Sequence, residues 1–172
     1  MFSDPVANIT KLGLNNSMKV VDMGAGSGFY TFESAKVVGS SGRVYAVEVQ
    51  KDLLEHIRSS GIMQGLQNIE VIWGDVEKIG GTKLREAIAD RVIASNILFQ
   101  IEKKDNFVLE IKRILKPGGK VLVVDWNSGS QFSPKTVVPP AVVQTLFEKN
   151  GFKLSQSFDA GDHHYGMVFA RN

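Results

Sequence analysis

The sequence predicts an α/β protein, a three-layer sandwich around a seven-stranded, mostly parallel sheet. The first observation is that short β-branched runs alternate with longer amphipathic stretches. Such alternation requires crossover connections, which join parallel strands. The second observation is that three runs are almost continuously apolar, as expected of strands covered on both faces. These runs are Val20-Val21, Val92-Ile93 and Val121–Val124.

The first five strands and four helices follow one another in order. The β-branched runs predict strands at Lys19–Met23, Arg43–Glu48, Ile69–Trp73, Arg91–Asn96 and Lys120–Trp126. The stretches between them predict helices at Phe29–Val38, Asp52–Gln64, Thr82–Ala89 and Lys103–Leu115. The fourth helix has apolar residues at a spacing of three to four and stops at Pro117-Gly118-Gly119, a sequence that ends helices.

The C-terminal part breaks this alternation. A predicted helix, Pro140–Asn150, ends at Gly151, the residue type that most often caps a helix C-terminus. Two strand-like runs follow, Lys153–Phe158 and His164–Arg171, and only residues 159–163 separate them. A link this short can make a hairpin but not a crossover helix, so we expect an antiparallel last strand.

Length and composition limit the class of protein. The 172 residues suit one domain, 1–172, and 43% hydrophobic with 22% charged residues is ordinary for a globular protein. The net charge of +2 gives no strong signal for nucleic acid or membranes. The absence of cysteine excludes disulfides, thiolate zinc sites and cysteine nucleophiles. No apolar run is long enough to span a bilayer and the N-terminus lacks a signal-peptide pattern, so we expect a cytoplasmic protein.

A glycine-rich loop carries the strongest functional signal. The first strand runs directly into Asp22-Met23-Gly24-Ala25-Gly26-Ser27-Gly28, and a helix follows. Glycines let a ligand approach the backbone, and the helix start offers free N–H groups. Glu48 ends the second strand about 20 residues further on, where an acid can accept both hydroxyls of a ribose. This arrangement predicts a nucleotide-like ligand.

The details of the loop favour S-adenosylmethionine over a dinucleotide. Counted from Gly24, the sixth position of the dinucleotide fingerprint is Phe29 and not glycine. Asp22 would repel a diphosphate and would instead favour a ligand with an ammonium group, in direct contact or through water. S-adenosylmethionine carries such a group at its amino-acid end.

Four motifs, in order, cover almost the whole chain and resemble those of Rossmann-like (class I) S-adenosylmethionine-dependent methyltransferases. The resemblance is closest to the small prokaryotic relatives of the ubiquinone/menaquinone-biosynthesis enzymes, and it implies the strand order 3-2-1-4-5-7-6 with strand 7 antiparallel. The motifs are Val21-Asp22-Met23-Gly24-Ala25-Gly26-Ser27-Gly28, Val44-Tyr45-Ala46-Val47-Glu48, Gly74-Asp75-Val76 and Leu115-Lys116-Pro117-Gly118-Gly119-Lys120-Val121.

The resemblance also implies roles for single residues around the adenosine. Glu48 would bind the ribose hydroxyls, and Val49 would pack on the adenine. Asp75 would face the adenine amino group with Val76 beside it, although Gly-Asp is also common turn chemistry after a strand. Because Glu48 lies at a strand end, we expect its replacement to leave the fold nearly unchanged.

The methionine end would lie against the glycine loop. Asn96 and Leu98, which follow the fourth strand, would line the sulfonium side. With these two residues, the full predicted cofactor set is Asp22, Gly24, Ala25, Gly26, Gly28, Glu48, Val49, Asp75, Val76, Asn96 and Leu98.

Candidate acceptor residues come from strand ends on the same side of the sheet, because ligands of open α/β sheets bind beyond the carboxyl ends of the strands. The candidates are Asn96, Trp126, His164 and Tyr165. His163 and His164 point to opposite sides of a strand, so one ion cannot bind both and we predict no metal site. We favour His164 as the residue that faces the pocket. No catalytic base is identified.

The sequence therefore predicts methyl transfer from S-adenosylmethionine to an unidentified acceptor, most simply a small molecule. The alternatives are an RNA or protein methyltransferase and a catalytically silent S-adenosylmethionine-binding protein. No proline follows Asn96, so the motif of enzymes that methylate amino groups of bases is missing. Only about 18 residues precede the first strand to form a lid, and we therefore expect an open acceptor site or one completed by a partner, for example in a homodimer.

Overall fold

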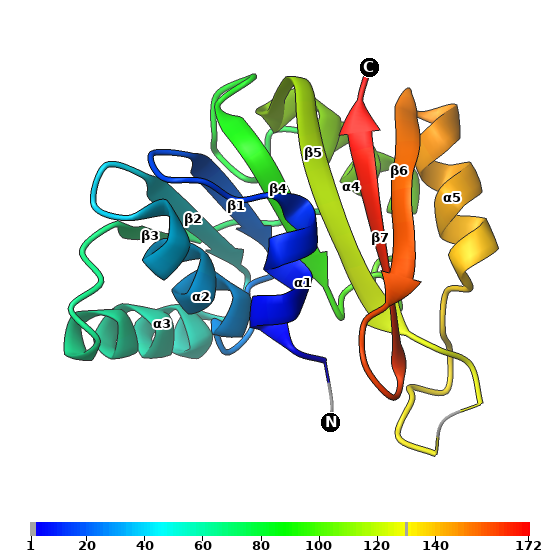
Figure 1. Cartoon of the computed structure of the whole chain (residues 1–172), viewed down its shortest axis with the longest axis horizontal. Coiled ribbons are helices and arrows are strands. Elements are labelled where there is room, and N and C mark those ends of the chain that lie inside the picture. The colour runs from blue at the N-terminus through cyan, green and yellow to red at the C-terminus, as the bar shows by residue number, and fades with distance from the viewer. Residues whose placement is uncertain (1–2, 130) are drawn as a thin grey trace.

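The computed structural model describes residues 3–129 and 131–172, which form one sheet covered by helices (Figure 1). The strand order is β3-β2-β1-β4-β5-β7-β6. Neighbouring strands from β3 to β5 pair in parallel, and β7 is antiparallel to both β5 and β6. The predicted order and the antiparallel last strand are confirmed. The strands are β1 (Lys19–Met23), β2 (Arg43–Glu48), β3 (Ile69–Trp73), β4 (Ala89–Ser95), β5 (Leu115–Trp126), β6 (Phe152–Asp159) and β7 (His164–Arg171).

Helices cover both faces of the sheet. One face carries α1 (Pro5–Leu12), α2 (Phe29–Val38) and α3 (Lys51–Met63), and the other carries α4 (Lys104–Ile114) and α5 (Pro140–Lys149) (Figure 1). Successive residues of β1 show why the central strands read as continuous apolar runs. Val20 packs with residues of α1 and α2, whereas Val21 packs with residues of α4 and α5. The predicted three-layer sandwich is therefore confirmed.

The predicted helix at Thr82–Ala89 is wrong, because turns link β3 to β4 and β4 already begins at Ala89. Lys83 and Ala87 have φ values of 59° and 49°, which no right-handed helix contains. The Thr82 hydroxyl donates to Oε1 of the buried Glu110 in α4 at 2.5 Å. A tertiary contact thus holds this segment in a non-helical shape that its amphipathic pattern does not reveal.

Helix α1 is the element that the sequence analysis missed. Its signals are local: Asp4 is the N-cap and accepts hydrogen bonds from the Val6 and Ala7 N–H groups, and Pro5 occupies the first turn. Gly13 ends the helix with a φ of 68°. The eight residues of α1 place the start of the chain against α2 and beside the cavity described below.

The β5 strand also starts earlier than predicted. Leu115 already pairs with Ala89 of β4, and a register shift follows before Arg91 pairs with Lys120. The Pro-Gly-Gly sequence, which ends α4 as predicted, therefore lies inside an irregular first part of the strand. The regular part, from Lys120 onward, coincides with the predicted strand.

Candidate functional site

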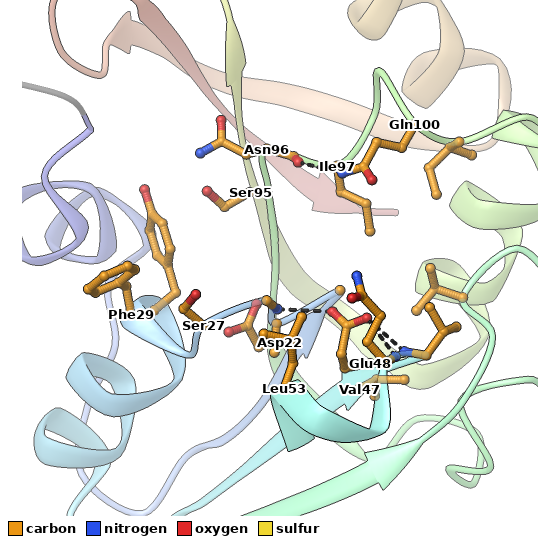
Figure 2. A pocket seen from close by; sticks show the side chains of 18 of the residues that line it. Asp22, Ser27, Phe29, Val47, Glu48, Leu53, Ser95, Asn96, Ile97 and Gln100 are labelled. Carbon is orange, nitrogen blue, oxygen red and sulfur yellow. Dashed lines mark hydrogen bonds between the residues drawn. The ribbon is translucent and has the colours of Figure 1, made fainter. Parts of the chain in front are cut away.

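A cavity of about 730 Å³ opens at the carboxyl ends of β1, β2, β4 and β5, where open α/β sheets bind ligands (Figure 2). Its volume lies within the usual range for small-molecule sites. Most of the predicted site residues line it. They are Asp22, Gly24, Ala25, Gly26, Glu48, Val49, Asp75, Val76, Asn96, Trp126 and His164.

The glycine loop is held against the end of β2. The Gly24 and Ala25 N–H groups both donate to the Val47 carbonyl, at 2.9 and 3.0 Å. Gly26 has a φ of 54°, and a Cβ built on it would meet nothing within 4 Å, so its backbone faces open space. Gly28 does not line the cavity. It begins α2 with a φ of 86° and packs so closely on Ile57 and Phe32 that a side chain there would collide with them.

Glu48 joins this loop to the start of α3. Its Oε2 accepts the Gly26 N–H at 3.0 Å, and its Oε1 accepts the Val49 and Gln50 N–H groups at 2.8 and 3.1 Å (Figure 2). The carboxylate is therefore fixed at the cavity wall. Both lone pairs of Oε1 are used by the two N–H groups, whereas Oε2 keeps one lone pair for a ligand. These contacts change the expectation that replacing Glu48 would leave the fold nearly unchanged, because the side chain also organises the loop.

Asp22 lies beside Glu48 at the same end of the cavity (Figure 2). It is 2% exposed, and its Oδ2 accepts a hydrogen bond from the Thr31 hydroxyl at 2.7 Å. Burial raises the pKa of Asp22 to about 6, and the neighbouring Glu48 adds to the rise, whereas the Thr31 hydrogen bonds oppose it. In the part of the chain that the structure describes, this carboxyl group has no positive partner, and the ammonium group of a ligand would supply one.

Asp75 lines the cavity and also makes the turn expected of a Gly-Asp pair. Its Oδ1 accepts the Glu77 N–H at 3.0 Å, and its Oδ2 lies 3.0 Å from Lys78 Nζ. The Glu77 hydrogen bond and Lys78 lower the pKa of Asp75. Val76, which is buried, and Val49, which is half exposed, also line the cavity. Two apolar side chains and a carboxylate thus contribute to its wall.

The loop after β4 departs from the prediction at one residue. Asn96 lines the cavity with a φ of 53°, but Leu98 is fully buried in the core among residues of α4 and does not line it. The structure corrects the Leu98 assignment, because the loop turns Leu98 inward to the core. The Leu98 N–H donates to Oδ2 of the buried Asp125 at 2.8 Å, so Asp125 fixes this loop to the end of β5.

The start of β7 places His164 in the cavity and Tyr165 away from it. The His164 ring, 1% exposed, packs on Trp126 with centroids 4.2 Å apart. Tyr165 points to the opposite face of the sheet, where it is buried and donates to the Val138 carbonyl at 2.7 Å. Tyr165 is therefore wrong as an acceptor-pocket residue, because side chains alternate along a strand.

Tyr165→Phe tests this correction. Removing the hydroxyl leaves the buried Val138 carbonyl unpaired, so we expect a loss of about 1 kcal/mol in the free energy of unfolding. Affinity for S-adenosylhomocysteine should stay unchanged, because Tyr165 lies outside the cavity. Urea unfolding and calorimetric titration measure the two quantities. A tenfold loss of affinity at unchanged stability would contradict the placement.

Several lining residues escaped the sequence analysis. Ser3 and Pro5 come from the segment around α1, and Tyr30 joins them because Asn8 Nδ2 donates to its hydroxyl at 2.9 Å. Only tertiary packing brings this segment to the cavity. In contrast, Gln50 and Leu53 follow Glu48 directly, and their position just after the second strand could have identified them.

The charge of the cavity lining is one-sided. Among the described residues, four carboxylates line it and no lysine or arginine does, the four being Asp22, Glu48, Asp75 and Glu77. Within residues 3–129 and 131–172, no three His, Asp or Glu side chains gather as metal ligands. In the same part of the chain, no helix has the length and apolar character needed to cross a membrane.

A Rossmann-like nucleotide-binding protein is defined by this sheet order together with the glycine loop and the acid at the end of β2. A family model described as a methyltransferase domain matches residues 14–164. The chain belongs to this family of S-adenosylmethionine-dependent methyltransferases. The fold is similar to the crystal structure of an S-adenosylmethionine-dependent methyltransferase from Aquifex aeolicus, with 26% identity, a TM-score of 0.88 and coverage of 98% of this chain and 89% of that one.

Curated relatives have similar sequence identities to this chain and are longer. A ubiquinone/menaquinone biosynthesis C-methyltransferase of Erwinia tasmaniensis is 25% identical over 157 residues, which are 89% of this chain and 59% of that protein. An arsenite methyltransferase of Aquipseudomonas alcaligenes is 28% identical over 116 residues, 65% of this chain and 34% of that protein. The chain thus spans less than two thirds of the length of these relatives.

Proposed function

We propose that this protein transfers a methyl group from S-adenosylmethionine to a small-molecule acceptor. The observation that carries the proposal is the pair of carboxylates at the ends of β1 and β2. Glu48 is fixed by three backbone N–H groups and keeps one lone pair on Oε2, and Asp22 is buried with no positive partner among the described residues. Both line one cavity that continues past Asn96 to His164.

The cavity suits the three parts of this molecule. The ammonium group would pair with Asp22, and the carboxylate would lie at the start of α2, which no side chain caps. The ribose hydroxyls would donate to Glu48. The adenine would lie between Val49 and Val76, with Asp75 near its amino group. S-adenosylmethionine supplies a methyl group already activated by the sulfonium charge. The residues of this chain bind it, orient it and exclude water.

The one-sided charge of the lining supports a small molecule over RNA. A polyanion binds through lysine and arginine contacts to its phosphates, and the described lining offers four carboxylates instead. The names of the curated relatives mention ubiquinone and menaquinone biosynthesis and arsenite, none of which is a macromolecule.

Calorimetric titration with S-adenosylhomocysteine is the direct test of this proposal. We expect saturable one-to-one binding with a Kd below about 1 mM and no comparable binding of NAD. Gly26→Ala should lower the affinity about tenfold, because it puts a methyl group where the ligand meets the backbone. Gly65 has a φ of 71°, is equally unobstructed and does not line the cavity, so Gly65→Ala is the matched control.

Both glycine variants should lose about 1 kcal/mol of stability, since both force alanine into the left-handed region. Only Gly26→Ala should lose affinity. Absence of S-adenosylhomocysteine binding at millimolar ligand would refute the proposal. Binding without turnover of labelled S-adenosylmethionine in cell extract would favour the catalytically silent alternative.

A further inference from the structure

We propose that Asn96, Trp126 and His164 form an acceptor subsite for an uncharged, planar molecule that carries a hydroxyl group. The inference rests on the proposed function and names the class of its substrate. The three residues come from the ends of β4 and β5 and the start of β7, and all three line the cavity. Asn96 lies well apart from Asp22 and Glu48 in Figure 2, toward the other end of the cavity.

Unused hydrogen-bonding capacity is the first argument. Oδ1 of Asn96 and both ring nitrogens of His164 are buried and have no hydrogen-bond partner among residues 3–129 and 131–172. Unpaired buried polar atoms are costly and rare in proteins, so several of them at one cavity point to a ligand that satisfies them. A neutral imidazole has one donor and one acceptor nitrogen, and an amide oxygen is an acceptor. A hydroxyl group can donate one hydrogen bond and accept another, so it matches this mixture.

Charge is the second argument. The carboxylates at the other end of the cavity repel an anionic acceptor, because no lysine or arginine among the described residues lines it. The subsite itself offers no carboxylate to a cationic acceptor, because its members are Asn96, Trp126 and His164. The buried acid that precedes Trp126, Asp125, already accepts hydrogen bonds from the Leu98 and Trp126 N–H groups. Burial and the neighbouring His163 lower the pKa of His164, which keeps its ring neutral near pH 7.

Shape is the third argument. The Trp126 and His164 rings lie against each other at an angle of 39°, and both belong to the cavity wall. Phe29, 70% exposed, and Tyr30 also line the cavity, and both belong to α2. Figure 2 shows Phe29 on this helix. Aromatic side chains in a pocket wall favour a flat ligand that packs on them.

Binding of small aromatic probes tests the subsite without knowledge of the natural acceptor. The protein is saturated with S-adenosylhomocysteine, so that the probes meet only the remaining space. Phenol, benzoate, benzylamine, toluene and cyclohexanol are then titrated, and carbon–proton NMR follows the rings of the three histidines. We expect phenol to shift the His164 signal and to bind about tenfold more tightly than each of the other four, which differ from it in charge, hydroxyl group or planarity.

His164→Phe gives an independent comparison, because it keeps a ring on Trp126 and removes both nitrogens. It should weaken phenol binding about tenfold and leave the S-adenosylhomocysteine affinity within about twofold. His163→Phe is the matched control: the His163 ring lies against Phe132, outside the cavity lining, and both affinities should persist.

The two proposals fail separately in this experiment. Missing S-adenosylhomocysteine binding refutes the proposed function. Normal S-adenosylhomocysteine binding refutes the subsite alone if benzoate or toluene binds as tightly as phenol, or if phenol leaves the His164 signal unmoved. If His164→Phe does not fold, the comparison of the five probes on the unaltered protein still decides.

Discussion

Asp22→Asn is expected to stabilise the ligand-free protein at neutral pH and to weaken its binding of S-adenosylhomocysteine. The pKa of Asp22 rises from its ordinary 3.8 to about 6 on folding, chiefly because the carboxyl group is buried. The folded state therefore binds this proton more tightly than the unfolded state does. Stability must fall as the pH rises from about 4 to about 6, and the full cost remains above that window.

The size of this effect follows from the shift. At 1.36 kcal/mol per pKa unit, the ionised Asp22 costs about 3 kcal/mol at pH 7, which asparagine would recover while still accepting the Thr31 hydrogen bond. A gain of several degrees in Tm is expected at pH 7, and none below about pH 4. Loss of the carboxylate should weaken S-adenosylhomocysteine binding at least about tenfold, because its ammonium group loses its partner.

Asp90→Asn is the matched control for this pH dependence. Burial raises the pKa of Asp90, but its contacts with Lys116 and the Lys19 N–H outweigh burial, so that the pKa is lowered overall. A lowered pKa means that ionised Asp90 stabilises the fold above its ordinary pKa, so Asp90→Asn should destabilise the protein at pH 7. Asp90 does not line the cavity, and binding should not change. Equal Tm changes of the same sign in both variants would contradict the assignment.

Glu48→Ala should damage both the cofactor site and the fold. It leaves the Gly26, Val49 and Gln50 N–H groups without their acceptor, and we expect a loss of about 2 to 4 kcal/mol in unfolding free energy. Affinity for S-adenosylhomocysteine should fall about ten- to a hundredfold, because the ribose hydroxyls lose a charged acceptor. Unfolding in urea and calorimetric titration measure the two losses.

Two further variants separate the roles of Glu48. Glu48→Gln keeps the volume and one acceptor oxygen but turns an NH₂ group toward backbone N–H donors, so it should lose less stability than alanine and still lose affinity. Glu70→Ala removes an exposed acid from the neighbouring strand β3 and should change neither quantity. If Glu48→Ala retains full affinity at reduced stability, Glu48 stabilises the glycine loop and does not contribute to ligand binding.

Features that depend on residues close together in the sequence could be predicted from the sequence. Continuous apolar runs such as Val121–Val124 identify strands buried on both faces, and the short segment 159–163 permits only a hairpin. The glycine loop and Glu48 correctly predicted residues that line the cavity. Their signal is local, because it depends on the backbone of the loop and on the position of the acid at the end of β2. The missed helix α1 had local signals too, in Asp4 and Pro5.

Tertiary structure alone decided the remaining features. The Thr82 hydroxyl donates a hydrogen bond to Glu110 of α4, which is distant in the sequence. This contact holds turns in the segment where the sequence pattern predicts a helix. Asn96 and His164 line the cavity, whereas their near neighbours Leu98 and Tyr165 point into the core. The packing of the loop and of the strand sets these directions. The raised pKa of Asp22 likewise exists only because the folded chain excludes water around it. The sequence determined the fold class and the cofactor class, whereas long-range packing determined which side chains face the cavity.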